Sequence, residues 1–90
     1  MPNDDSAWYR PDNEAAIDSP ALLIFPDRVQ QNIDTALRMV GHPTRLRPHV
    51  KTHKSMEVTG MMMASGISQF KCATIAEAEM LGMCKAPHVL

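Results

Sequence analysis

The sequence predicts an α/β fold made of successive strand–helix units. Short apolar runs alternate three times with segments of helical periodicity, and a fourth apolar run begins at Pro87–Leu90. Such units connect through right-handed crossovers into a parallel sheet. A closed barrel of eight units typically needs about 250 residues. The 90 residues therefore predict a fragment: a polar leader at 1–17, then at 18–90 the truncated N-terminal portion of a (β/α)8 barrel, about three and a half units.

Composition and charge argue against several classes of partner. Nine Lys and Arg residues face ten Asp and Glu residues, the net charge is −1, and aromatic residues make up 4% of the chain. A nucleic-acid module would be basic and would carry aromatic side chains for stacking. We see neither a secretory signal nor an apolar segment near the roughly 18 residues that cross a bilayer. We therefore expect no nucleic-acid or membrane partner and a cytoplasmic location, with Cys72 and Cys84 as free thiols.

The first unit is predicted at residues 20–40. Pro20–Phe25 is a continuous apolar run, typical of a strand buried on both faces. Pro26 then begins a helix, and Gly41 ends it as a C-cap. The helix presents an apolar stripe made of Val29, Ile33, Leu37 and Val40.

The second and third units follow the same order. Arg45–Val50 is the second predicted strand, in which Pro48 is unusual because it cannot donate to a ladder and could mark a bulge. Ser55 caps a helix through about Ala64, whose methionines are interpreted as core filling. Gln69–Ala73 is the third strand.

A capping box is predicted where the third helix begins. Thr74 satisfies a free N–H at the helix start, and Glu77 returns the bond. We interpret Glu77 and Glu79 as a cap and a solvated face rather than as an acid/base pair. Thr74 also falls at the rim where β/α barrels place ligand-binding groups, so a ligand contact is a second role for this residue.

The segment Arg47–Lys54 is the most informative part of the chain. Read as a strand, it places Arg47, His49, Lys51 and His53 on one face. Such a row is costly to bury unless an anion lies on it. It predicts the wall of an anion-binding site and a plausible setting for an amine nucleophile able to form a Schiff base, Lys51. The alternatives are a solvated basic face, a nucleic-acid patch, or a metal held by the two histidines, which would need a helix.

The octamer RPHVKTHK resembles the cofactor-lysine strand of the D-threonine aldolase and D-serine dehydratase family. These are pyridoxal-phosphate enzymes with an alanine-racemase-type N-terminal barrel. Asp18–Leu22 is similar to the family's opening strand, and Phe70–Glu79 is similar to its third strand and following helix. In the family, the lysine between the two histidines carries the cofactor. The resemblance implies that this lysine is Lys51, not Lys54.

The resemblance also implies an activity. It predicts a pyridoxal-phosphate-dependent lyase of D-β-hydroxy amino acids, first a D-threonine-aldolase-like enzyme because FKCATIAEAEML looks closest to that branch. D-serine dehydratase is the next alternative, an amino-acid racemase the third, and a non-catalytic pyridoxal-phosphate-binding protein lies outside the class. Lys51 is the expected catalytic residue, and Lys51, His49 and Thr74 are the expected cofactor-binding residues.

Further expectations concern the full-length protein. The resemblance implies a divalent metal whose ligands lie outside these 90 residues, so none is placed on this chain. It also implies a homodimer acting on a small D-amino acid. We expect the 90 residues alone to be inactive.

Overall fold

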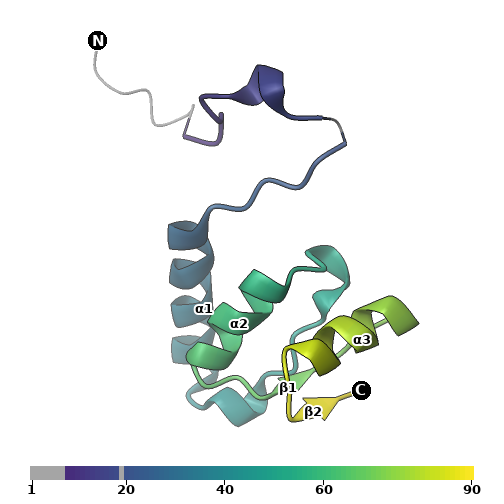
Figure 1. Ribbon diagram of the computed structural model, residues 1–90. Coiled ribbons are helices and arrows are strands. Elements are labelled where there is room, and N and C mark those ends of the chain that lie inside the picture. Colours follow the sequence, from purple (N-terminus) through teal and green to yellow (C-terminus); the bar gives the residue numbers. More distant parts are fainter. Residues whose placement is uncertain (1–7, 19) are drawn as a thin grey trace.

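Figure 1 shows the computed structural model, which describes residues 8–18 and 20–90. Within these residues it is a small α/β unit of three α-helices, three 3-10 turns and two short strands. In chain order the elements are η2 (Glu14–Ala16), α1 (Pro26–Val40), η3 (Pro43–Arg45), η4 (Val50–Thr52), α2 (Met56–Ala64), β1 (Gln69–Phe70), α3 (Ile75–Met83) and β2 (His88–Val89). The α/β class is confirmed, whereas a barrel is not demonstrated by these elements. The first seven residues of the predicted leader lie outside the described residues.

The two strands form a parallel sheet, as the alternation of strand and helix predicts. β1 pairs with β2 so that Gln69 lies opposite His88 and Phe70 opposite Val89. The ladder extends beyond the strands, because the Cys72 N–H donates to the Leu90 carbonyl at 3.0 Å. The helix α3 connects the two strands (Figure 1). The predicted third strand is therefore real, although its regular part is shorter than Gln69–Ala73.

The other edge of β1 meets the segment that carries the basic octamer. Lys71 and His49 form an isolated parallel bridge. In this bridge the Val50 N–H donates to the Lys71 carbonyl, and the Lys71 N–H donates to the Pro48 carbonyl, both at 2.9 Å. The spatial order is thus the second predicted strand, the third and the fourth, all parallel, which is the order of successive β/α units.

The prediction of a regular strand over Arg45–Val50 is wrong. Pro43–Arg45 and Val50–Thr52 are 3-10 turns, and only the single bridge remains between them. Proline has no N–H, so the ladder cannot continue past Pro48 toward the start of β1. Beyond this point a side-chain hydrogen bond joins the two segments instead: Gln69 Nε2 donates to the Thr44 carbonyl at 2.9 Å.

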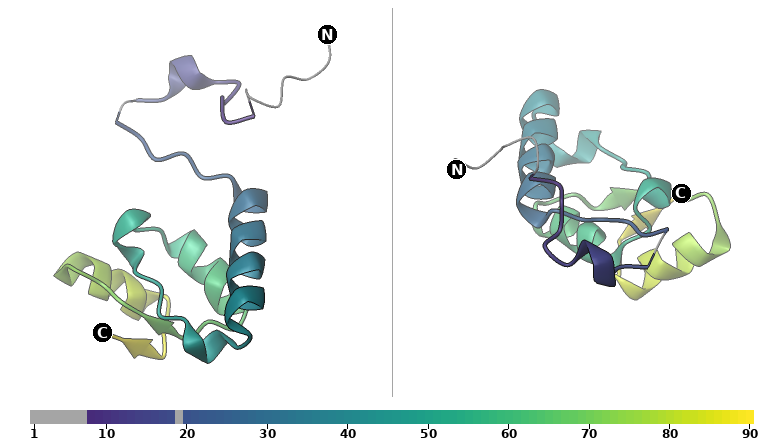
Figure 2. Two further views of the ribbon diagram at one scale, coloured as in Figure 1. Left: turned by 180° about the vertical axis from the view of Figure 1, so that it is seen from behind. Right: turned by 90° about the horizontal axis from the view of Figure 1, so that it is seen from above.

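The prediction of a first strand at Pro20–Phe25 is also wrong. Residues 21–25 form no helix or strand, and Leu22, Leu23 and Ile24 are 60%, 44% and 39% exposed. The left view of Figure 2 shows this stretch as an extended chain that runs, apart from the sheet, to the start of α1. Strand preference depends on packing against neighbours, and within the described residues this run pairs with no strand.

The helices follow the predicted boundaries because their end signals are local. Gly41 has φ 84° and its N–H donates to the Leu37 carbonyl at 2.9 Å, a left-handed C-cap that glycine adopts without steric cost. Ser55 caps α2 by accepting the Val58 N–H at 3.1 Å. Gly66 follows α2 with φ 101°, where a Cβ would lie 3.3 Å from Pro43 Cγ.

The core lies between the sheet and the three helices. The apolar stripe of α1 is confirmed, since Ile33 is buried and Val29 and Leu37 pack against the same cluster. Met61, Met62 and Met63 also pack against it, as their interpretation as core filling predicts, whereas Met56 at the start of α2 is 41% exposed and lies outside the cluster. The buried members of the cluster are Ile33, Val50, Ile67, Phe70 and Leu81.

Leu81→Ala tests this core. Leu81 is 0% exposed, so the loss of its side chain leaves a cavity and should lower the free energy of unfolding by about 2–5 kcal/mol. The matched control is Ile75→Ala on the same helix, which is 80% exposed and should change stability by at most about 0.5 kcal/mol. Urea unfolding followed by circular dichroism measures both, and equal losses would contradict the placement of the core.

Candidate active site

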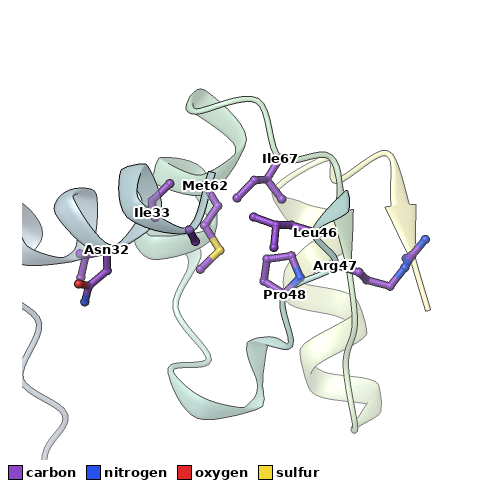
Figure 3. A pocket seen from close by; sticks show the side chains of 9 residues that line it. Asn32, Ile33, Leu46, Arg47, Pro48, Met62 and Ile67 are labelled. Carbon is purple, nitrogen blue, oxygen red and sulfur yellow. The ribbon is translucent and has the colours of Figure 1, made fainter. Parts of the chain in front are cut away.

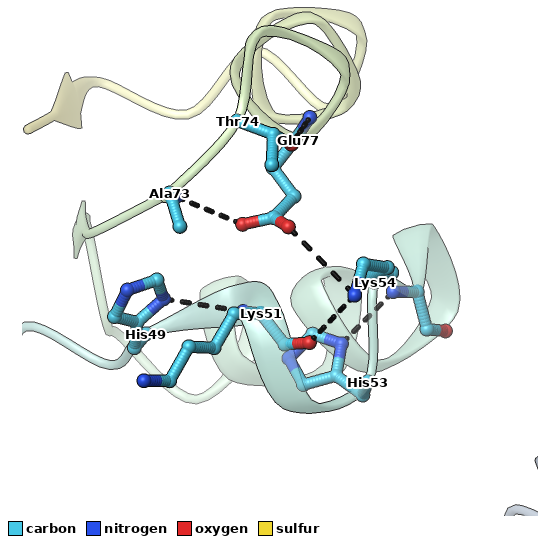
Figure 4. Close-up of polar contacts among 8 residues, drawn as sticks. His49, Lys51, His53, Lys54, Ala73, Thr74 and Glu77 are labelled. Carbon is cyan, nitrogen blue, oxygen red and sulfur yellow. Dashed lines mark hydrogen bonds and ion pairs between the residues drawn. The ribbon is translucent and has the colours of Figure 1, made fainter.

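The parallel ladder brings two predicted site residues to the same edge of the sheet. Lys51 follows the bridge residue His49, and Thr74 follows its partner Lys71. Carboxyl ends of parallel strands share one edge, where β/α proteins place their ligand-binding groups. The candidate site is therefore this edge, built from η4 and from the turn before α3 (Figure 4).

The continuous basic face expected from strand alternation does not form. Residues Val50–Thr52 turn as a 3-10 helix, so the period of two stops at His49. Arg47 is bound to β1 instead. Its Nη1 donates to the Phe70 carbonyl and its Nη2 to Gln69 Oε1, both at 2.9 Å. Arg47 thus fastens the second strand segment to β1.

Lys51 carries the free amine of the site. Its side chain is exposed, and its Nζ has neither a hydrogen bond nor an ion pair with any described residue. Its backbone N–H donates to His49 Nδ1 at 3.2 Å, which makes His49 the N-cap of the turn. Figure 4 shows the Lys51 side chain running away from Glu77. An unpaired amine with access to solvent is what attack on an aldehyde requires.

Lys54 is placed quite differently, although it lies only one turn further along. Its backbone has φ 51°, a left-handed conformation that is uncommon for a residue with a Cβ. The side chain folds back, so that Nζ donates to the Lys51 carbonyl at 3.1 Å and lies 3.9 Å from Glu77 Oε2. No pattern in the sequence indicates this ion pair, since its two members are far apart along the chain.

Glu77 is a buried carboxylate at the centre of these contacts. It is 3% exposed. Its Oε1 accepts the Ala73 N–H at 2.9 Å, and its own N–H donates to Thr74 Oγ1 at 3.1 Å. The bond to Ala73 is the main cause that lowers the pKa of Glu77, followed by the contact with Thr74 and the charges of Lys54 and His49, against an opposing effect of burial.

The predicted capping box is confirmed in outline. Thr74 is the N-cap of α3, but Glu77 returns its bond to Ala73, one residue before the cap. Thr74, Glu77 and Lys54 line a hollow of about 170 Å³ together with Ala76 and Met80. A cofactor contact for Thr74 stays a prediction.

His53 lies at the back of the site, facing the apolar stretch before α1. Its Nδ1 accepts the Ser55 N–H at 2.9 Å, while its Nε2 is buried and has no hydrogen-bond partner among the described residues. His53 lines a hollow of about 330 Å³ with Leu22–Phe25 and Val58. Burial lowers the pKa of His53, because the apolar surroundings disfavour its charged form.

A third hollow, of about 410 Å³, lies between α1 and residues 46–48 (Figure 3). Its lining is mainly aliphatic, with Ile33, Leu46, Pro48 and Ile67. Arg47 is the only charged residue among the described residues that line it, and in Figure 3 its guanidinium points away from the hollow toward its partners on β1. This hollow therefore continues the core and offers no anion site.

Three further observations concern the described residues as a whole. Within residues 8–18 and 20–90, no group of three or more His, Cys, Asp or Glu side chains could hold a metal ion. Cys72 and Cys84 are free, as predicted. No helix of the described residues is both long and apolar enough to traverse a bilayer.

Comparison with known proteins gives one informative match. Over 69 residues, 76% of this chain, the sequence is 44% identical to D-threo-3-hydroxyaspartate dehydratase from Delftia sp. (strain HT23). The chain spans 18% of the length of that relative. No family model and no solved structure matches the chain.

The match covers the segment that contains Lys51, and the name of the relative bears on the reaction. It covers 69 of 90 residues, which leaves 21 outside it, so Lys51 falls within the matched stretch wherever the match begins. The relative is named as a dehydratase of a D-hydroxy amino acid. Among the reactions that the family resemblance implies, this name supports the dehydratase alternative better than the aldolase.

His53→Asn tests the buried imidazole. Because the folded pKa of His53 is lowered, its stabilising contribution is complete above about pH 6.5, the unfolded value, and is lost as the pH falls toward the folded pKa. Asparagine keeps an acceptor for the Ser55 N–H but does not titrate. The loss of unfolding free energy between pH 8 and pH 5 should therefore shrink in His53→Asn.

His42→Asn is the matched control for this measurement. His42 Nδ1 accepts the Thr44 N–H at 3.2 Å in the same manner, but from an exposed side chain. The change in pH dependence should be larger in His53→Asn than in His42→Asn, because the His53 imidazole is buried and the His42 side chain is exposed. An unchanged pH dependence in His53→Asn would contradict the assignment.

Proposed function

We propose that this chain belongs to a pyridoxal-phosphate-dependent dehydratase of D-3-hydroxy amino acids, in which Lys51 is the residue that binds the cofactor covalently. The observation that carries the proposal is the 44% identity to D-threo-3-hydroxyaspartate dehydratase over a stretch that includes Lys51. The free amine of Lys51 at the carboxyl edge of a parallel sheet supports it independently.

The residues of this edge fit such a cofactor. Bond formation with an aldehyde requires an amine that is not held in an ion pair with a carboxylate. Lys51 Nζ has no ion pair within the described part of the chain. When bound, pyridoxal phosphate supplies an electron sink for the bond that breaks at Cα. Lys51 would hold the cofactor. His49 would fix the Lys51 backbone by accepting the Lys51 N–H at Nδ1, and Thr74 would offer a hydroxyl at the same edge.

The choice of dehydration over aldol cleavage rests on the named activity of the relative. Both reactions, and racemisation, use the same lysine, so the lysine itself does not discriminate among them. The same proposal includes a truncated (β/α)8 barrel, completed by the rest of the protein, which the order of the three parallel segments supports. A divalent metal and a homodimer complete it, on the strength of the family resemblance, and a cytoplasmic location, on the strength of the two free thiols.

Borohydride reduction of the full-length protein with pyridoxal phosphate tests the cofactor lysine. Peptide mapping should find the reduced adduct on Lys51, and Lys51→Arg should abolish both the adduct and the activity, since a guanidinium cannot form it. Lys85→Arg, an exposed lysine near β2, is the matched control and should keep both. An adduct on Lys54 alone would refute the assignment.

The reaction itself is tested with D-threo-3-hydroxyaspartate. Dehydration removes Cα–H and Cβ–OH as water, and hydrolysis of the resulting imine then returns a water and releases ammonia and oxaloacetate. Aldol cleavage breaks the Cα–Cβ bond and gives glycine and glyoxylate. We expect stoichiometric ammonia and oxo acid without glycine. Glycine would restore the aldolase, the L-isomer would indicate a racemase, and no turnover with the adduct in place would indicate a non-catalytic binding protein.

A further inference from the structure

The two lysines of the octamer differ in what their amines contact. Lys51 Nζ is free of partners within the described residues, whereas Lys54 Nζ donates to the Lys51 carbonyl at 3.1 Å and faces Glu77 Oε2 at 3.9 Å. Both side chains are exposed, that of Lys54 by 66%. Access to solvent therefore does not decide which amine reacts. The contacts of Lys54 do, because its amine must first give up its hydrogen bond and its ion pair before it can meet an aldehyde.

Glu77 is well placed to hold Lys54 in this role. It is buried, and its carboxylate is fixed by the Ala73 N–H at 2.9 Å, so its position does not depend on Lys54. The same contact lowers the pKa of Glu77, which keeps the carboxylate ionised at neutral pH. A fixed carboxylate 3.9 Å from Lys54 Nζ favours the side-chain conformation in which this amine faces Glu77 rather than solvent.

The Lys54 backbone adds a second constraint. Its N–H donates to the Val50 carbonyl at 2.8 Å, and its left-handed φ of 51° turns the chain out of η4 into the cap of α2. The side chain then returns to the Lys51 carbonyl (Figure 4). Backbone and side chain of Lys54 together close the turn from which Lys51 projects.

We propose that Lys54 and Glu77 form a positioning pair that holds the Lys51 turn and withdraws the Lys54 amine, so that an aldehyde reacts at Lys51. The pair acts through Lys51 and touches no reacting atom. The inference rests on the proposed function for the identity of the aldehyde, but the difference between the two amines stands on the contacts alone.

Reductive methylation of the full-length protein without cofactor tests the difference directly. Limiting formaldehyde with cyanoborohydride is followed by peptide fragmentation to read Lys51 and Lys54 separately. Lys51 should react faster than Lys54. Glu77→Gln keeps an acceptor for the Ala73 N–H but removes the charge, and it should raise the Lys54-to-Lys51 labelling ratio about two- to fivefold, the size expected for one exposed ion pair.

Glu79→Gln is the matched control, since it removes the same charge from an exposed position of α3. It should leave the labelling ratio unchanged. Equal labelling of the two lysines in the unsubstituted protein, or an unchanged ratio in Glu77→Gln with circular dichroism showing a folded protein, would overturn the inference.

A second pair of variants separates positioning from folding and covers the case in which Glu77→Gln does not fold. Lys54→Gln should lower the fraction of Lys51 that limiting pyridoxal phosphate occupies, measured by borohydride trapping, by about two- to fivefold. Lys54→Arg retains a charged donor and should restore it. Equal occupancy in both variants would overturn the positioning role.

The results distinguish this inference from the proposed function. If pyridoxal phosphate forms no adduct on Lys51 while the methylation ratios behave as expected, the proposed function fails and the withdrawal of Lys54 stands. If the adduct forms on Lys51 but neither the Glu77 nor the Lys54 variants change labelling, the proposed function stands and the positioning pair is refuted.

Discussion

The hydrogen bonding of residues 70–72 on both sides is the constraint on which the candidate site depends. Lys71 exchanges two backbone bonds with residues 48–50, and Cys72 and Phe70 bond to Leu90. Because all three segments run parallel, their carboxyl ends are brought to one edge. The 3-10 turn η4, which carries Lys51, and the start of α3, which carries Glu77, thereby become neighbours, although they are far apart in sequence.

Local signals in the sequence specify the helices well. The α1 stripe around Ile33, its Gly41 cap and the Ser55 cap of α2 each follow from residues within a few positions of one another. Their physical cause is equally local, since a cap satisfies backbone groups of its own helix. For the same reason the sequence alone identifies Thr74 as a cap, and its hydroxyl does accept the Glu77 N–H.

Strands and side-chain faces were predicted less well because their causes are not local. The run at Pro20–Phe25 is apolar enough for a strand, but a strand forms only where a neighbour can pair with it. Pro48 shortens the second strand to one bridge, and the following 3-10 turn ends the alternation that placed Arg47 and Lys51 on one face. Hydrophobic periodicity also cannot reveal that Glu77 is buried, because a capping box has the same sequence whether its glutamate faces solvent or protein.

The octamer contains two lysines, Lys51 and Lys54, whose amines lie in different surroundings. An amine that reacts with an aldehyde must be free of other contacts, whereas an amine that holds the backbone must keep its donor contacts. Lys51 lies within η4, whereas Lys54 lies two residues beyond its end with a left-handed φ of 51°, and their side chains leave the chain in different directions (Figure 4). One amine points away from the buried carboxylate, and the other folds toward it. The turn therefore directs the Lys51 amine away from Glu77 and the Lys54 amine toward it, which is the arrangement that the proposed positioning pair requires.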